Sequence, residues 1–429
     1  MHRAPKNTSK PETVNMTLSE TVREALTEGT VSGLVRAPEN NYTTLLVLRE
    51  LQSHAVFTTN GQDADIATVT VSNSEETIEY SPGLMFMRKQ TGSDRRFAKS
   101  IQRDLIGRDC TMKVNEMCQT CPECVLYGSA ASENEDQAVS VTSRVMYDTA
   151  YSVRDASAVI DEKFQNAPGD EYAKEATTAI REPDFFEPGA LFPSVITLRD
   201  TTPEEVAFVL GITLQNKRYG AATTRLGRIK NHVLGAYVGS EEGPANLELS
   251  QELARRFAES EGGLENTVLS GSLDSEDARE HTRAAFDDIR QSESLSLSPV
   301  GEDVLNELRT VATDDLASVL ETQESASEAF IENASLSWMS SKSSSKRRAR
   351  WGSPHERSDG RPTRPSTCST RRSTTRSGSR RADTWTRFTV QRIRKTPPRS
   401  WRTCISRRPN RLTSPITGRR STTHVATDT

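Results

Sequence analysis

The sequence predicts an α+β protein, in which antiparallel strands and helices occupy separate parts of the chain. Residues 43–48 (TTLLVL) form an apolar run that is typical of a buried strand. Residues 202–205 (TPEE) combine a threonine cap, a proline at the first helical position and a glutamate at the third, which indicates a helix start. Four cysteines between residues 110 and 124 indicate a small metal-binding insertion.

The segment before residue 80 favours strands. Residues 31–80 are β-like, and residues 64–71 alternate around β-branched side chains. The pair Asn60-Gly61 precedes this alternation and is typical of a turn between strands. We therefore expect antiparallel strands here, ahead of the first long helix.

A helix and the cysteine segment follow. Residues 84–109 place Phe97, Ile101 and Leu105 at intervals of four, which puts these apolar side chains on one helix face. Residues 110–128 contain the cysteines and are expected to form a compact knuckle.

The rest of the body mixes strands and helices. We expect a strand at 139–151, an inserted polar loop or thumb at 160–190, a helix from 203 to about 214, a strand at 229–237, and acidic helices from 249 to about 320, broken near Gly262 and Pro299.

These elements divide the chain into a core with insertions and two dissimilar ends. We expect a disordered leader at residues 1–16, a core at 17–335 and a disordered Arg/Ser/Thr-rich tail at 336–429, and Met16 offers an alternative start. The expected parts of the core are a basic helix with the cysteine knuckle at 84–128, an inserted loop or thumb at 155–195 and an acidic helical part at 249–335.

The formal net charge of −4 averages two unlike segments. Residues 339–429 contain 24 Lys and Arg and 4 Asp and Glu, whereas residues 1–338 contain 31 basic and 55 acidic residues. The acidic body has only nine lysines, a pattern that favours a halophile, because carboxylates keep a surface hydrated in a salt-rich cytoplasm. An acidic protein of a mesophile is the alternative.

The Arg-rich tail has two interpretations. Of its 24 basic residues 21 are arginine, and it has no hydrophobic period. Acidic codons of GC-rich DNA give Arg, Thr and Ser codons when they are read out of frame, so we favour a frameshift product. A genuine disordered tail that binds nucleic acid is the alternative. Cys368 and Cys404 lie in this segment and receive no role.

Cys110, Cys118, Cys121 and Cys124 are the only cysteines in the first 338 residues and have the spacing C-x7-C-x2-C-x2-C. The C-x2-C pairs bring thiolates to one ion, and four thiolates complete the tetrahedron that Zn²⁺ prefers. We predict a structural zinc site, because a closed shell leaves no open position. An iron–sulfur cluster, disulfides and free thiols are the alternatives, and a reducing cytoplasm disfavours disulfides.

Residues 206–240 interrupt the acidic pattern, since they contain no Asp or Glu. Glycine lets the backbone approach a phosphate, Arg and Lys neutralise its charge, and tyrosine offers a stacking face. A buried helix–loop–strand with a few solvated cations is the alternative. The predicted RNA contacts here are Lys217, Arg218, Tyr219, Gly220, Thr224, Arg225, Arg228 and Lys230.

A second basic segment spans residues 85–109, with seven cations and three carboxylates. Arg95, Lys99 and Arg103 recur every four residues, so they share a helix face that could follow a phosphate backbone. A solvated helix face is the alternative. The predicted RNA contacts of this segment are Arg88, Lys89, Arg95, Arg96, Lys99 and Arg103, with Arg144 on the strand that follows the knuckle.

Catalysis and membrane insertion have little support. No phosphate-binding loop or nucleophile elbow is present, and acidic residues are too frequent for Asp63, Asp65 or Asp148 to be singled out. No run of 18 apolar residues and no secretion signal is seen, so we expect a cytoplasmic non-enzyme. The histidines of the body lack metal-ligand spacing; they are His2, His54, His232 and His281.

Six short motifs together resemble a known family. They are VRAP at 35–38, LVLRE at 46–50, CQTCPECVLYG at 118–128, SRV at 143–145, KRYGA at 217–221 and TRLG at 224–227. Over roughly residues 17–335 the chain resembles the larger Csc proteins, the type I-D branch of the CRISPR Cas-seven backbone family in the RAMP superfamily. The cysteine knuckle beside the Arg-Tyr-Gly-Ala loop is the most specific part, and the Arg-rich tail departs from the family pattern.

The resemblance implies a fold and a role. The fold would be a modified RNA-recognition-motif (ferredoxin-like) core with an inserted four-cysteine zinc knuckle and thumb-like subdomains. Copies of the protein would stack head to tail on CRISPR guide RNA, beside other type I-D subunits, while base pairing with the guide reads the target nucleic acid. The residues that match the family's glycine-loop motif are Lys217, Arg218, Tyr219, Thr224 and Arg225.

Three functions remain open at this point. We expect a backbone subunit of a Cascade interference complex, an antiviral ribonucleoprotein that carries guide RNA. A metal-dependent ribonuclease of the same family, cleaving target RNA, is one alternative. A zinc-containing nucleic-acid-binding module outside CRISPR is the other.

Overall fold

The computed structural model describes residues 18–350, except 114–115, 131–138, 163, 166–179 and 270–272. The chain divides into two compact units, Met1–Pro354 and His355–Thr429, and every described residue belongs to the first. The predicted leader, much of the predicted thumb and the tail beyond residue 350 lie outside the described residues.

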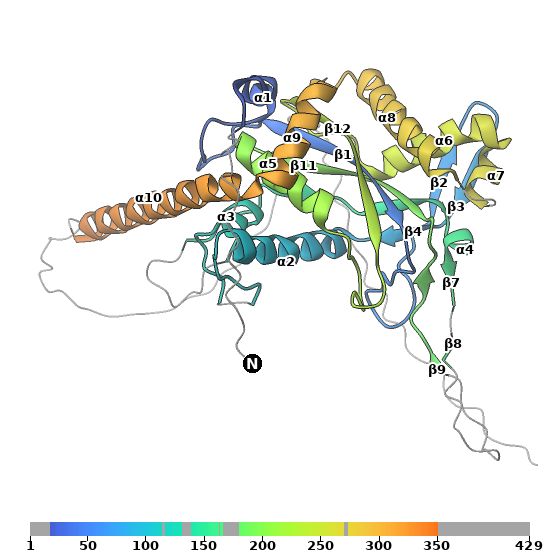
Figure 1. Cartoon of the computed structure of the whole chain (residues 1–429), viewed down its shortest axis with the longest axis horizontal. Coiled ribbons are helices and arrows are strands. Elements are labelled where there is room, and N and C mark those ends of the chain that lie inside the picture. Colours follow the sequence, from blue (N-terminus) through green and yellow to red (C-terminus); the bar gives the residue numbers. More distant parts are fainter. Residues whose placement is uncertain are drawn as a thin grey trace, which may run out of the picture. The chain divides into compact units, whose positions relative to one another are not determined.

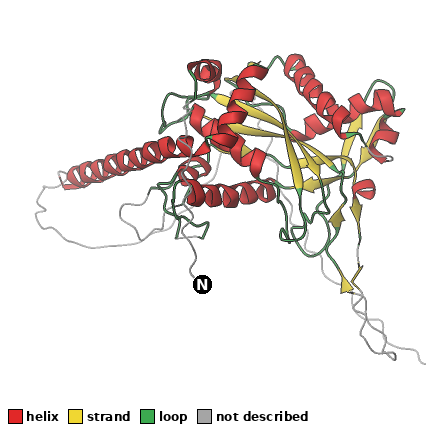
Figure 2. Cartoon of the chain, in the orientation of Figure 1, coloured by secondary structure: helices red, strands yellow, loops and turns green. Residues whose placement is uncertain are grey.

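A five-stranded antiparallel sheet forms the centre of the fold (Figure 2). Strand β1 (Tyr42–Leu51) pairs with β11 (Leu191–Arg199) on one side and with β12 (Ile229–Gly239) on the other. The outer strands are β5 (Val145–Tyr147), which pairs with β11, and β13 (Leu297–Pro299), which pairs with β12. Together with the helices, this sheet confirms the predicted α+β class.

Helices cover both faces of the sheet, and this explains the apolar run in β1 (Figure 1). Successive side chains of a strand point to opposite faces. Leu45 and Val47 therefore enter one core, and Leu46 and Leu48 enter the other. A strand that is buried on both faces shows a continuous apolar run rather than alternation.

The first core contains the predicted helix start. Thr202 accepts a hydrogen bond from the backbone N–H of Glu205, and the Glu205 side chain accepts one from the backbone of Thr202, forming a capping box. Gly211 permits close packing within this core, because a β-carbon there would lie 2.7 Å from the carbonyl oxygen of Ala312. The helices of this face are α1 (Glu20–Leu26), α5 (Pro203–Gln215), α9 (Glu302–Asp314) and α10 (Leu316–Arg350), with α2 (Met87–Leu105) beside them.

The second core packs three acidic helices on the opposite face. The predicted break near Gly262 is the end of α6, where this glycine has a left-handed conformation with φ 78°. The predicted break near Pro299 coincides with strand β13, which precedes α9. The helices of this face are α6 (Asn246–Glu261), α7 (Leu264–Leu269) and α8 (Ser275–Ser292).

Smaller elements surround the sheet. The 3-10 turn η1 (Thr27–Gly29) follows α1, and two short helices are α3 (Pro122–Tyr127) and α4 (Ala156–Val159). The two-stranded pairs are β2 (Val69–Ser72) with β3 (Thr77–Tyr80), β4 (Pro82–Met85) with β6 (Ala150–Asp155), β7 (Ile160–Asp161) with β10 (Phe185–Phe186), and β8 (Phe164–Gln165) with β9 (Ile180–Arg181).

Two features differ from the elements expected from sequence. Strand β11 was not expected, and Pro193 within it argues against a central strand. The structure accommodates this proline because β5 pairs only with residues 196–198 of β11. Helix α10 continues to Arg350, past residue 335, where the acidic helical part was expected to end and the disordered tail to begin. Among the described residues, no helix combines the length and the hydropathy that a membrane span requires.

Candidate nucleic-acid interface and cysteine cluster

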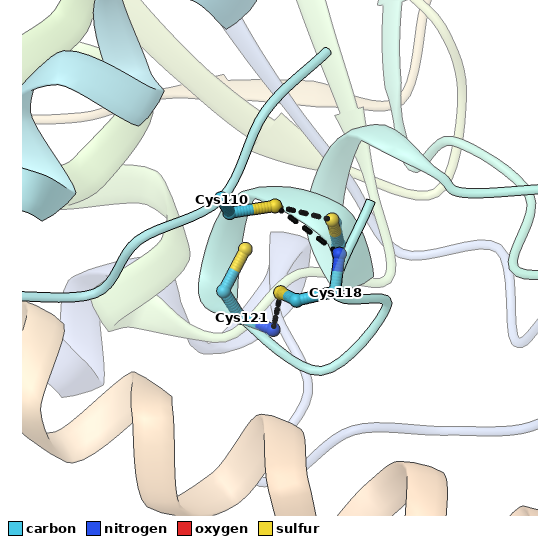
Figure 3. Close-up of side chains that lie close together, drawn as sticks. Cys110, Cys118 and Cys121 are labelled. Atoms are coloured by element: carbon cyan, nitrogen blue, oxygen red, sulfur yellow. Dashed lines mark hydrogen bonds between the residues drawn. The ribbon is translucent and has the colours of Figure 1, made fainter. Parts of the chain in front are cut away.

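The four predicted metal ligands converge on one point. Figure 3 labels three of them, Cys110, Cys118 and Cys121. Their Sγ atoms lie within 4.8 Å of one another, and the Sγ atoms of Cys110 and Cys124 are 3.7 Å apart. A tetrahedral zinc ion about 2.3 Å from each sulfur requires a sulfur–sulfur distance of about 3.8 Å. The four thiols are free of disulfides. The arrangement therefore fits a single ion better than an iron–sulfur cluster, whose cysteines bind different irons.

Local backbone geometry brings the cysteines together. Pro122 occupies the first turn of α3, which places Cys121 before the helix and Cys124 inside it. The backbone N–H of Cys118 donates to Cys110 Sγ at 3.3 Å, and that of Cys121 donates to Cys118 Sγ at 3.3 Å. The four sulfurs share protons through hydrogen bonds: these lower the pKa of the Cys118 thiol and raise the pKa of the Cys121 and Cys124 thiols.

Lys99 of α2 lies against the cysteine cluster, and its side chain is only 2% exposed. Its Nζ atom is 2.5 Å from the Glu123 carboxylate and donates to Cys110 Sγ at 2.9 Å and to Cys124 Sγ at 3.4 Å. Burial opposes the charge, but the carboxylate of Glu123 and the sulfur of Cys121 raise the pKa of Lys99 above its usual value. The predicted RNA contact at Lys99 is corrected, because the fold turns this lysine toward the sulfurs.

The rest of the same helix face also packs on the knuckle. Arg95 Nε lies 2.5 Å from Glu123, and its Nη2 donates to the carbonyl of Gly128 at 2.7 Å. Arg103 Nη1 donates to the carbonyl of Cys110 at 2.9 Å. In the structure, all three cations of the predicted phosphate-following face therefore contact the knuckle. Lys99 is buried, but Arg95 is half-buried and Arg103 is exposed, so the RNA contacts of Arg95 and Arg103 stay predictions.

Arg144 has a structural partner too. Its guanidinium pairs with both carboxylate oxygens of Glu205, at 2.6 and 2.5 Å, and donates to the carbonyl of Asp200 at 3.0 Å. Glu205 belongs to the capping box of α5, so this pair joins the strand after the knuckle to the first core. Arg144 is half-buried and has this internal carboxylate partner, and its RNA contact stays a prediction.

The glycine loop, residues 216–229, is fixed by its own backbone. The N–H of Tyr219 donates to the carbonyl of Gly227 at 2.9 Å. Gly220 has φ 87°, and a β-carbon there would lie 2.5 Å from the carbonyl oxygen of Val56. Gly227 has φ 75°, and a β-carbon there would meet the carbonyl of Tyr219 at 1.9 Å. Both glycines thus permit close packing of the loop on the protein itself, and the predicted phosphate approach at Gly220 stays a prediction.

Tyr219 points inward and is fully buried. Its hydroxyl donates to Asp94 Oδ1 at 2.7 Å and accepts from Asn231 Nδ2 at 3.0 Å. The guanidinium of Arg49, from the LVLRE motif, lies 5.2 Å from the centre of its ring. Burial raises the pKa of the Tyr219 hydroxyl. The predicted stacking face is therefore corrected: the Tyr219 ring is buried beneath the loop, which its hydroxyl joins to Asp94, and no ring surface is exposed.

Several side chains of the glycine loop face outward. Arg218 is half-buried and donates to the carbonyl of Leu226 at 3.1 Å. The exposed candidates of this loop and of the strand that follows are Lys217, Thr224, Arg225, Arg228 and Lys230.

The N-terminal half of α2 adjoins the same loop. Ser93 donates to the carbonyl of Arg218, and Asn216 donates to Asp94 Oδ1 at 2.7 Å. Lys89 donates to the carbonyl of Thr58 at 2.6 Å, close to the segment that packs under Gly220. The structure thus brings the two basic segments of the sequence together at this end of α2. The exposed cations on this part of the helix are Arg88 and Arg96.

A separate groove of about 390 Å³ collects two of the sequence motifs. The VRAP residues at 35–38 form one side, and residues 139–144, which include part of the SRV motif, form another. Arg199 and Phe330 also line it. Sequence spacing gave no sign that these motifs meet, because more than 100 residues separate them.

The fold and site together define an α+β protein in which one basic helix packs against a four-cysteine cluster and a cationic loop. The model of the Csc2 CRISPR family matches residues 22–327, and the chain belongs to this family. No curated protein sequence matches the chain significantly.

Three solved structures are similar to this chain. The crystal structure of Thermofilum pendens Csc2 has 16% identity, a TM-score of 0.49 and coverage of 76% of this chain and 94% of its own. A chain of a CRISPR RNA-guided surveillance complex has 11% identity, a TM-score of 0.38 and coverage of 66% and 99%. A chain of a type IV-B CRISPR complex has 12% identity, a TM-score of 0.29 and coverage of 48% and 93%.

Proposed function

We propose that this protein binds CRISPR guide RNA as a repeated backbone subunit of a type I-D interference complex and holds the guide for pairing with its target. Membership of the Csc2 CRISPR family supports the assignment to such a complex. The observation that carries RNA binding is the glycine loop, whose cations face solvent on a chain whose first 338 residues are strongly acidic. Phosphate charge would be attracted to this surface and repelled by most others.

The proposed RNA surface is narrower than the sequence predicted. It consists of the cations of the glycine loop and of the adjoining end of α2, while the cations that contact the knuckle or pair with Glu205 are left out. RNA contact here would use charge and backbone shape, and base pairing would read the target sequence. The proposed contacts are Lys217, Arg225, Arg228 and Lys230, with Arg88, Lys89 and Arg96 beside them and Arg218 and Thr224 at the rim.

Several finer statements belong to this proposal. We interpret the antiparallel sheet as the modified RNA-recognition-motif core, and residues 17–335 as the functional unit. Further copies of the chain would continue the surface along the guide, because a head-to-tail contact between identical subunits builds an open helical array. We also propose that the organism is a halophile, on the basis of the acidic, lysine-poor body.

The four-cysteine cluster is proposed to hold a structural Zn²⁺ ion. Cys110, Cys118, Cys121 and Cys124 supply all four ligands, and the ion would cross-link the loop after α2 to α3. No open coordination position remains for a substrate. The proposed role of the metal is therefore to fix the knuckle against α2.

RNA binding is tested with the full chain and two single-stranded RNAs of unrelated sequence. Replacing Arg225 and Arg228 by alanine should weaken binding of both RNAs about equally. It should also lower the slope of log affinity against log salt by about 0.7 for each lost phosphate contact. Lys113→Ala is the control, since Lys113 is exposed but pairs with Glu116 beside the knuckle.

Unchanged affinity and salt slope in the double variant would place RNA elsewhere and contradict the proposed surface. Cleavage of either RNA that depends on a divalent ion would support the ribonuclease alternative instead. Fluorescence anisotropy measures the first outcome, and denaturing gel electrophoresis of the same samples measures the second.

A further inference from the structure

Helix α2 makes contacts of two kinds at two levels along its length. Near its middle, Lys99 donates to the sulfurs of Cys110 and Cys124. Six residues earlier, Ser93 donates to the carbonyl of Arg218 in the glycine loop, and Asp94 accepts from Tyr219. Six residues of an α-helix span about 9 Å. The same helix therefore contacts both the proposed metal site and the glycine loop.

Lys99 offsets part of the negative charge around the cluster. Four thiolates around a divalent ion leave a net charge of −2, and the buried Glu123 carboxylate adds another negative charge. Buried charge is costly unless it is paired and hydrogen-bonded. Lys99 meets the carboxylate and two of the sulfurs at once, whereas Arg95 meets only the carboxylate. Arg108 is a second cation beside the sulfurs and faces Cys118, whereas Lys99 contacts Cys110 and Cys124 and is the buried one of the two.

The glycine loop depends on α2 for its internal anchor. Asp94 is fully buried and accepts hydrogen bonds from Asn216, Tyr219 and Tyr147. A displacement of α2 would move Asp94 away from these three donors and leave buried polar groups unpaired, which costs free energy. The position of the loop is therefore tied to the position of this helix.

We propose that Lys99 is a positioning residue that couples the metal centre to the glycine loop. It compensates the charge of the metal–thiolate centre and fixes α2 at the level where Ser93 and Asp94 hold the loop. Metal loading then determines how well the loop is ordered, although within the described part of the chain no hydrogen bond joins the four cluster cysteines to the loop. The inference rests on the proposed metal site, and its tests do not require RNA.

The first test measures how Lys99 affects the metal itself. In the full chain loaded with zinc, Lys99→Gln should speed zinc loss to a chromogenic chelator by about 10- to 100-fold, the range usual for partners of metal ligands. Lys99→Arg should restore most of the retention, because it keeps a charged donor. Lys113→Gln, which changes an exposed lysine of the knuckle, should lose zinc at the unmodified rate.

A spectroscopic readout separates charge compensation from simple packing. In the protein loaded with Co²⁺, donors to a thiolate lower the energy of its electrons and raise the energy of the sulfur-to-cobalt transition. Lys99→Gln should therefore shift this band to longer wavelength, and Lys99→Arg should shift it less. If Lys99→Gln retains zinc as well as the unmodified protein does, and its cobalt band lies at the same wavelength, the proposed role of Lys99 is wrong.

The second test uses the unmodified chain, so it does not depend on whether a variant folds. Hydrogen exchange is compared between zinc-loaded and chelator-stripped protein. The Tyr219 and Gly227 amides, which donate within and beneath the loop, should exchange faster without zinc and recover when zinc is restored. Amides of α6 and α8, in the second core, are the reference.

Both other outcomes of this exchange experiment count against the coupling. Faster exchange confined to residues 110–128 would show that the knuckle loosens without affecting the loop. Equal acceleration in α6, α8 and the loop would show that the metal stabilises the whole chain without a specific link through α2. If the protein does not bind RNA but the loop amides do exchange faster without zinc, the proposed function is rejected. The coupling between the metal centre and the glycine loop is then still supported.

Discussion

The two basic segments of this protein look alike in sequence but differ in structure. Arg95, Lys99 and Arg103 of α2 bond to a carboxylate, to sulfurs and to carbonyls of the knuckle, and of these three only Arg103 is exposed. Lys217 and Arg225 of the glycine loop are exposed, because that loop satisfies its backbone groups internally. The difference shows that a cation is available to a ligand only where the fold places no hydrogen-bond acceptor or carboxylate against it. The spacing of cations in the sequence does not decide this.

If this comparison is correct, the largest effect should come from removing the carboxylate that faces the inward cations. Glu123→Ala leaves Lys99 and Arg95 buried without their shared partner, which should cost about 3 to 5 kcal/mol of unfolding free energy. Urea unfolding of the full chain measures it. Glu116→Ala, at an exposed pair with Lys113, should change stability by less than about 0.5 kcal/mol. Equal effects of the two changes would remove the basis of the comparison.

Tyr219 gives the next largest expected effect and tests its role as an anchor. Tyr219→Phe removes the hydroxyl that bonds Asp94 and Asn231 and should destabilise the chain by about 1 to 3 kcal/mol. RNA affinity measured under conditions where the variant is folded should stay within about twofold. Tyr219→Leu should likewise keep RNA affinity if the ring does not stack on bases. A large loss of affinity with unchanged stability would restore the stacking interpretation.

Asp200 extends the comparison to an inward-facing carboxylate. Burial raises its pKa, but hydrogen bonds from the backbone of Asn41 and Glu39 more than offset this, so its pKa in the folded protein is lowered. Its stabilising effect is therefore present above the unfolded value of about 3.9 and is lost as the pH falls through the folded pKa.

The measurement is unfolding of Asp200→Asn and of the unmodified chain at pH 7 and pH 3. Asparagine tolerates the positive φ of 51° at this position, so backbone strain is not introduced. We expect a deficit of about 1 to 2 kcal/mol at pH 7 that shrinks at pH 3. A deficit that is independent of pH would show that the charge of Asp200 does not contribute.

The smallest effect on stability is expected at the outward cations. Arg225→Ala with Arg228→Ala should change the unfolding free energy by less than about 0.5 kcal/mol, because these side chains are exposed. The same double variant should weaken RNA binding, as proposed above. Thermal unfolding and anisotropy on one preparation provide both numbers, and a marked loss of stability would mean that the loop cations are structural after all.

Sequence patterns located most of the elements on which the site is built. The apolar run became β1, the TPEE sequence became the capped start of α5, and the interval of four became α2. These signals are local, because strand alternation, helix capping and helix periodicity depend on residues within a few positions. Strand β11 was missed because Pro193 gives a local signal against a strand, and only its neighbours in the sheet explain why it is tolerated.

By itself the sequence determined the α+β class, the cysteine set with its metal-like spacing, and the existence of two cationic segments in an acidic body. The direction in which each cation and Tyr219 points was decided only by the tertiary structure. Direction depends on acceptors such as Glu123 and Asp94, which lie far along the chain from some of their partners and meet them only after packing. Residue type and spacing record charge, whereas burial and pairing arise from long-range contacts that no local pattern contains.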